Sequence, residues 1–168
     1  MAEKAKTLQD LFQETLKDIF YAEKKILTAL PKMAKAAHSP DLQSAFRKHE
    51  RQTQGQVERL KQVFAMIDET AKGKTCEAVN DIFEEGNEVI KEFKNSPALD
   101  AGLLAAAQAV EHYEISRYGT LKTWANELGL SDAVPLLDQT LQEEIETDEA
   151  LTELAESAVN QEAQQAAE

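Results

Sequence analysis

The chain has 168 residues, the size of one ordinary domain with enough apolar surface to bury its own core. Its 31 acidic and 18 basic side chains give a formal net charge of -13, which repels phosphate backbones and anionic lipid, so neither nucleic acid nor a membrane is an expected partner. One cysteine excludes an intramolecular disulfide, and no secretory signal or apolar run of roughly 18 residues is visible. We therefore expect a cytoplasmic, single-domain protein.

Glycine and proline are scarce, so they and the capping side chains mark where helices begin and end. Thr7 and Ser39 are expected helix caps, and Gly129 is expected to break a helix. The polar residues 159–168 carry too little apolar surface to hold themselves down and are predicted to fray. Five helices are predicted, over residues 7–37, 40–70, 76–94, 97–127 and 131–158.

Four of these helices are long, and the lengths of their connections predict how they are arranged. Short links join the first long helix to the second and the third to the fourth, so each pair is expected to be antiparallel. The link between the second and third is long and contains the shorter helix at 76–94. The sequence therefore predicts an all-α, ferritin-like four-helix bundle whose long crossover contains a short fifth helix.

Acidic residues interrupt the apolar stripes of these helices near their middles. In the first helix Glu23 follows Phe12, Leu16 and Ile19 at alternating steps of four and three residues. The third long helix, at 97–127, carries Glu111 and Glu114 on its apolar face, and the fourth, at 131–158, carries Glu144 and Asp148 there. Each of these carboxylates is expected to point toward the bundle axis.

The second helix carries two neighbouring stripes, and they predict different inward residues. One stripe runs through Phe46, Glu50 and Thr53, while the other runs through Phe46, His49, Thr53 and Gln56. Both His49 and Glu50 are therefore candidate ligands, and Gln54, four residues after Glu50, is a further one. We assign Glu50, because it supplies the acid that the other three helices also supply.

Four inward acids imply a compensating cation. Removing one carboxylate from water costs several kcal/mol unless positive charge offsets it. Oxygen-rich ligation with few imidazoles suits iron or manganese, and carboxylates from four helices of a bundle typically hold a pair of such ions. The predicted site is a dinuclear iron or manganese centre held by Glu23, Glu50, Glu114 and Glu144, with Glu111 and Asp148 assisting.

Several segments of the chain resemble a known bacterial family. The block Val110-Glu-His-Tyr-Glu-Ile115 is the most specific, and Phe20-Tyr-Ala-Glu-Lys24 and Thr140-Leu-Gln-Glu-Glu144 add to it. They closely resemble the YciE/YciF-like proteins over nearly the whole chain. The resemblance implies a ferritin-like bundle that forms a homodimer, is linked to stress responses and has no established reaction.

One departure from di-iron bundles is visible. Those proteins usually carry Glu-x-x-His on two helices, whereas Thr53 and Thr147 stand three residues after Glu50 and Glu144. We expect a ferritin-like stress-response protein whose dinuclear centre reacts with oxygen or peroxide, and leave open whether it is an enzyme. The alternative is a metal-free structural or interaction protein whose acids are neutralised by Arg51, by Arg117, by lysines or by protonation.

Overall fold

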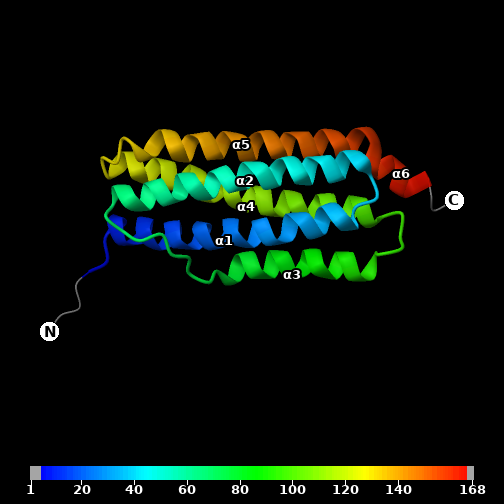
Figure 1. Cartoon of the computed structure of the whole chain (residues 1–168), viewed down its shortest axis with the longest axis horizontal. Coiled ribbons are helices and arrows are strands. Elements are labelled where there is room, and N and C mark those ends of the chain that lie inside the picture. The colour runs from blue at the N-terminus through cyan, green and yellow to red at the C-terminus, as the bar shows by residue number, and fades with distance from the viewer. Residues whose placement is uncertain (1–4, 166–168) are drawn as a thin grey trace.

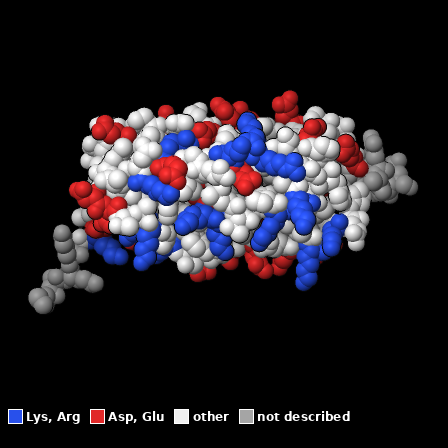
Figure 2. Space-filling view, in the orientation of Figure 1, with Lys and Arg blue, Asp and Glu red and all other residues white. Residues whose placement is uncertain are grey.

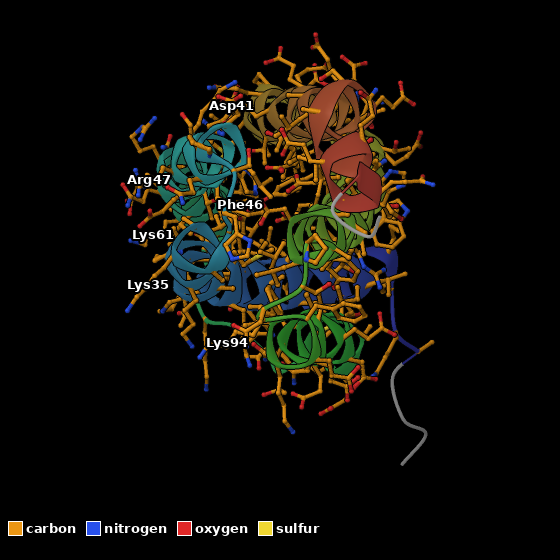
Figure 3. The ribbon with its side chains drawn as sticks, turned by 90° about the vertical axis from the view of Figure 1, so that its right-hand side faces the viewer. Lys35, Asp41, Phe46, Arg47, Lys61 and Lys94 are labelled. Atoms are coloured by element: carbon orange, nitrogen blue, oxygen red, sulfur yellow. The ribbon has the colours of Figure 1, made fainter. Side chains whose placement is uncertain are left out.

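A computed structural model describes residues 5–165. Four long helices lie side by side along the molecule (Figure 1): α1 (Leu8–Ala36), α2 (Pro40–Met66), α4 (Leu99–Glu127) and α5 (Ala133–Leu154). Helix α3 (Glu77–Glu92) belongs to the long connection between α2 and α4, and packs outside the bundle against α1 and α4 (Figure 3). This is the predicted ferritin-like bundle with a fifth helix in its crossover. None of the helices in the described part is long and apolar enough to cross a membrane.

The starts of α1 and α2 follow from capping side chains. The Thr7 hydroxyl accepts a hydrogen bond from the Asp10 N–H, and the Asp10 carboxylate accepts one from the Thr7 N–H, which completes a capping box. Ser39 caps α2 by accepting from the Leu42 N–H, with Pro40 in the first turn, where a missing N–H does no harm. Both predicted caps are confirmed.

The turn between α1 and α2 is held by a residue from another helix. Asp100 on α4 is 7% exposed, and its two carboxylate oxygens accept hydrogen bonds from the N–H groups of His38 and Ser39 at 2.8 and 2.6 Å. These bonds satisfy donors that a turn would otherwise leave to water. Asp100 therefore fixes the height of α4 against the α1–α2 pair.

Helix α2 ends at Met66, four residues before the expected end near position 70. Asp68 adopts the left-handed conformation, with φ of 56°, and the Glu69 N–H bonds back to the Phe64 carbonyl, so the chain leaves the helix at this point. The connection then crosses α1, where the Lys74 N–H donates to the Lys17 carbonyl. A Cβ on Gly73 would lie only 3.1 Å from the Tyr21 Cβ, so glycine permits this close crossing.

Small residues let α3 approach the bundle closely. A Cβ on Gly102 of α4 would lie 2.6 Å from the Val89 Cγ1 atom on α3, so even alanine would force the Val89 side chain or the two helices to shift. Val79 is the only side chain of α3 that is fully buried. The helix therefore covers the bundle with partly buried apolar side chains instead of contributing a full layer.

The helices after α3 differ from expectation at their ends. Helices α4 and α5 begin two residues later than predicted, because short turns at Ser96–Ala98 and at 130–132 precede them. Helix α5 then continues through a π-helical turn (Ala155–Val159) into α6 (Asn160–Gln165). Val159 is 2% exposed in the core, which anchors a segment that the sequence predicted to fray. Residues 166–168 of that segment lie outside the described residues.

The core consists of two apolar clusters with a polar layer between them. We name the clusters after their central phenylalanines. The Phe64 cluster includes Phe12, Leu16, Ile19, Phe20, Leu60, Val63, Phe64, Tyr118, Leu121 and Leu137. The Phe46 cluster includes Ile26, Leu30, Leu42, Phe46, Leu99, Leu103, Leu104 and Leu151. In every long helix the buried residues that separate the two clusters are polar; this acidic layer comprises Glu23, His49, Thr53, Gln56, Glu111, Glu114 and Glu144.

Candidate metal centre

The acidic layer collects carboxylates from three helices and an imidazole from the fourth. Glu23 comes from α1, Glu111 and Glu114 from α4, and Glu144 from α5, and none of the four is more than 2% exposed. His49 of α2 is 3% exposed. One ligand atom from each of His49, Glu111, Glu114 and Glu144 lies within 4.8 Å of the others, a spacing at which one metal ion could contact all four. Glu23 also lies close enough to Glu114 for its charge to raise the pKa of that carboxyl group.

The predicted ligand Glu50 lies outside this layer. It is half-buried and lines a surface depression with Lys35 and Arg47. An end view shows Phe46 directed into the bundle and Arg47 directed away from it (Figure 3). His49 is buried together with Thr53 and Gln56, so it points inward, whereas Glu50, about 100° further round the helix, is half-buried and lies off the axis. Of the two stripes left open by the sequence, the one through His49 and Gln56 is buried, and the alternative candidate Gln54 is exposed.

Asp148 is likewise at the edge of the layer and not within it. Its side chain is 20% exposed, one oxygen accepts from Gln108 Nε2 at 3.1 Å, and the other lies 3.2 Å from His112 Nε2. Both partners are on α4, and His112 is exposed. Because both of its partners are on α4, Asp148 lies toward that helix and away from the axis.

Two hydrogen bonds orient the acids. The Tyr118 hydroxyl donates to Glu23, and the Gln56 amide donates to Glu144. The sequence allows Tyr118 either to pack in the core, which is the default, or to shuttle electrons or hydrogen-bond a ligand carboxylate; it assigns no role to Gln56, although Gln56 stands on the His49 stripe. The position of Gln56 on that stripe could have indicated its role, because a fully buried glutamine needs hydrogen-bond partners for its amide.

The cation nearest to the layer is engaged with other groups. Arg59 on α2 forms an ion pair with Glu143 and donates to the Thr140 hydroxyl at 2.9 Å. Gln56 Nε2 also reaches Glu143 Oε2 at 3.2 Å, so the Arg59–Glu143 pair borders the layer at its outer rim. Arg117, an expected neutralising cation, lies over the Tyr113 ring with its guanidinium carbon 5.1 Å from the ring centre.

No lysine or arginine among residues 5–165 forms an ion pair with a member of the acidic layer. His49 Nε2 lies 3.2 Å from Glu111 Oε1 and 3.9 Å from Glu144 Oε2, while its Nδ1 has no hydrogen-bond partner. Several buried carboxylate oxygens also lack a donor within the described residues: Glu23 Oε2, Glu111 Oε2, both oxygens of Glu114, and Glu144 Oε2. Each such orphan costs about 1 to 3 kcal/mol, and more when it is charged.

Burial governs the protonation of the whole layer. Loss of hydration raises the pKa of Glu23, Glu111 and Glu114 well above the ordinary value, and the neighbouring carboxylates raise it further. Burial also raises the pKa of Glu144 to about 7. It lowers the pKa of His49 to about 4, so the imidazole is neutral near pH 7 and offers lone pairs instead of positive charge.

These residues fit a metal centre in their charge and their donor atoms. Four ionised carboxylates would balance two divalent cations, and their oxygens with one neutral imidazole suit iron or manganese. The set is poorer in nitrogen than that of di-iron bundles with Glu-x-x-His on two helices. The inward positions of α2 are His49, Thr53 and Gln56, so that helix contributes one imidazole and no carboxylate.

Comparisons with known proteins agree with this architecture. A family model described as a domain of unknown function (DUF892) matches residues 7–164. Protein YciF of Escherichia coli K12 is 44% identical over 160 residues, which span 95% of this chain and 96% of YciF.

Solved structures also match over most of this chain. The crystal structure of YciF, described as an E. coli stress protein, matches with a TM-score of 0.88 and 44% identity over 93% of this chain and 99% of that chain. YcfI of Rhodopseudomonas palustris, described as a putative structural protein, matches with a TM-score of 0.86 and 42% identity over 90% and 97%. A protein of Xanthomonas campestris matches with a TM-score of 0.74 over 96% and 100%, but at 21% identity, which shows the fold alone.

Proposed function

The chain belongs to the DUF892 family of YciF-like proteins, and from the acidic layer in its core we propose that it binds a dinuclear iron or manganese centre. His49, Glu111, Glu114 and Glu144 would hold the first ion, because their ligand atoms already lie together. Glu23, which lies close enough to raise the pKa of Glu114, would help to hold the second. Glu50, and Asp148 at the edge of the layer, are left out of this ligand set.

The observation that carries the proposal is the set of buried carboxylate oxygens without donors. Natural cores rarely leave such groups unpaired, so each orphan calls for an explanation such as an ion. In this core the orphans come from different helices and face one another beside a neutral imidazole. Divalent cations would satisfy all of them at once.

The protein residues around the centre have separate roles in this proposal. The Tyr118 hydroxyl and the Gln56 amide hold Glu23 and Glu144 in place, as hydrogen bonds to ligand carboxylates do in other metal sites. The bundle keeps water away from the layer, since its members are almost completely buried. A bound redox-active metal would supply electrons to oxygen or peroxide, which suits a protective role such as the stress association of YciF.

The second candidate is a metal-free structural protein, and one observation favours it. The raised pKa values mean that protons can neutralise the acids in place of metal ions. The description of YcfI as a putative structural protein points the same way. The two candidates differ in what neutralises the layer.

Metal analysis with matched variants separates the two candidates. Protein purified without chelators should contain near-stoichiometric iron or manganese, and adding metal to stripped protein at a hundredfold excess over Kd should raise its unfolding free energy by about 2.7 kcal/mol. Glu114→Gln should weaken binding more than about tenfold in calorimetric titration. Glu50→Gln, the matched control on α2, should bind as the wild type does. A protein that takes up no metal and shows no thermal shift is the structural bundle.

The cytoplasmic location and the homodimer expected from the sequence also belong to this proposal. The family resemblance supports the homodimer. Sedimentation equilibrium tests it directly, and a monomer at micromolar concentration would contradict it.

A further inference from the structure

A groove on the outside of the bundle leads toward the acidic layer. It lies between α1 and α3, which run side by side (Figure 1), and has a volume of about 130 Å³. Its apolar side chains include Ala29 and Met33 from α1 and Phe83 and Ile90 from α3. Two lysines, Lys25 and Lys32, also line it, and no acidic side chain does.

A second, smaller void lies deeper in the bundle. Its volume is about 10 Å³, close to that of one water-sized molecule. Ala29, Met33 and Phe83 line both this void and the outer groove, so these three side chains form the partition between the two. The inner wall of the void includes His49 and Glu111 of the acidic layer.

His49 makes the inner void chemically distinct from a packing defect. The imidazole is 3% exposed, and its Nδ1 atom has no hydrogen-bond partner within the described residues. Glu111, beside it on the wall, also has an oxygen without a donor. The void therefore borders two residues of the proposed metal site that carry unpaired polar atoms, while the rest of its lining is apolar.

We propose that the groove and the void form an access route by which a small apolar molecule of the size of dioxygen reaches the His49–Glu111 end of the acidic layer. This inference rests on the proposed function, because it assigns a route to the same site. Phe83 of α3 closes the route from outside, together with Ala29 and Met33 of α1. The crossover helix thereby gains a role beyond connecting α2 to α4.

The side chains that line the route determine which molecules can pass through it. The apolar walls of the inner void give no hydrogen bonds to replace those that a polar molecule leaves in water, which costs several kcal/mol and excludes hydrated species. Lys25 and Lys32 repel cations from the groove, so metal ions reach the acids elsewhere. Figure 2 shows that lysine and arginine side chains gather over α1 and α2 on this face, although the chain is acidic overall. Dioxygen needs neither hydrogen bonds nor a counter-charge.

The packing of α3 makes movement of Phe83 feasible. Phe83 is only partly buried, and Val79 is the single fully buried side chain of its helix. Elements with few buried apolar contacts open at low free-energy cost, whereas closely packed walls do not. The outer partition can therefore open by a local motion that leaves the four long helices in place.

Xenon binding tests the route without any metal. Crystals of the metal-free protein under xenon pressure should show a xenon atom in the inner void, because xenon is apolar and settles in small apolar cavities. Ala29→Leu should abolish that peak by filling the void, and Phe83→Ala should enlarge it. Ala105→Leu, on the exposed face of α4, is the matched control and should leave the xenon peak unchanged.

Kinetics on the loaded protein give the second readout. With ferrous iron bound, Ala29→Leu should react with dissolved dioxygen on the order of tenfold more slowly than the wild type or Ala105→Leu, because a packed wall opens only by fluctuation. Iron affinity should be the same in all three. An equal slowing with hydrogen peroxide, a polar molecule, would overturn the selectivity of the route for apolar molecules, while an unchanged peroxide rate supports it.

The outcomes separate the two proposals. Bound metal with no xenon peak and equal oxygen rates would overturn the route and leave the metal centre standing. A xenon peak that Ala29→Leu removes, in a protein that binds no metal, would support the cavity route and overturn the proposed function.

Discussion

The apolar clusters and the acidic layer are equally buried but hold the helices together in opposite ways. In the Phe64 cluster the rings of Phe20 and Phe64 pack edge to face, with their centres 5.5 Å apart, among buried apolar side chains. In the acidic layer, side chains of the same exposure leave oxygen atoms without donors. The clusters supply stability by themselves, whereas the layer lowers it until protons or metal ions neutralise its acids.

A second comparison shows that burial of an acid does not by itself indicate a ligand. Asp100 beside the Phe46 cluster and Glu114 in the acidic layer are both buried carboxylates. Asp100 accepts two backbone N–H donors, from His38 and Ser39, and so is satisfied as it stands. Glu114 has no donor within the described residues. Lack of partners, and not depth, is therefore the feature that points to a bound cation.

The largest expected effect tests the apolar side of the comparison. Phe64→Ala removes a side chain that is 1% exposed and should lower the free energy of unfolding by about 3 to 5 kcal/mol through lost burial and a residual cavity. Chemical denaturation of metal-free protein measures this. Leu11→Ala, at a position that is 50% exposed, is the control and should change stability little. A small loss at Phe64 would mean that the clusters are not the main source of stability.

The pH dependence tests the layer. Glu144 has a pKa of about 7 in the folded protein against 4.5 when unfolded, so the folded state binds more protons between these values and loses stability as the pH rises through them. This one group contributes a fall of up to about 3 kcal/mol. Glu23, Glu111 and Glu114 act in the same direction. His49, with its pKa lowered to about 4 from 6.5, opposes them by favouring folding at higher pH.

Four carboxylates outweigh one imidazole, so metal-free protein should be more stable near pH 5 than near pH 8. Thermal melts across this range, with chelator present, measure the trend. Adding metal should reverse it, because metal ions compete with protons for the same oxygens. A metal-free protein that gains stability toward pH 8 would show that the acids are satisfied in some other way.

Replacing one acid by a hydrocarbon should separate stability from function. Glu114→Leu removes two orphaned oxygens and should stabilise the metal-free protein at pH 8 by about 2 kcal/mol, since apolar replacement of buried ionic groups is often stabilising. It should also abolish the stabilisation that metal gives. Paired melts with and without metal measure both effects, and a less stable metal-free variant would argue that Glu114 is already well partnered.

The smallest effect concerns the satisfied acid. Asp100→Ala leaves the N–H groups of His38 and Ser39 without their acceptor and should destabilise the protein by about 1 to 2 kcal/mol. The expected change in stability has the opposite sign to that of Glu114→Leu, and metal affinity should not change. Denaturation and calorimetric titration of the two variants, measured together, show whether hydrogen-bond partners decide the role of a buried acid.

Local sequence rules fixed most of the helices and four of the inward acids, Glu23, Glu111, Glu114 and Glu144. Thr7 and Ser39 lie at helix starts because their hydroxyls satisfy N–H groups within three residues, and no distant part of the chain is needed. Glu23, Glu114 and Glu144 interrupt single, unambiguous apolar stripes, so the face they occupy follows from helical periodicity alone. The bundle and its acidic middle could therefore be predicted.

Only the tertiary structure decided how α2 is rotated and how far the layer extends. Two stripes of α2 differ by one residue, and packing against α1 and α5 selected the stripe that buries Val63 and His49 and turns Glu50 outward. The outward position of Asp148 likewise depends on its partners on α4. A helical period constrains each helix separately, whereas the choice between adjacent faces depends on the burial summed over all the helices, which no single segment encodes.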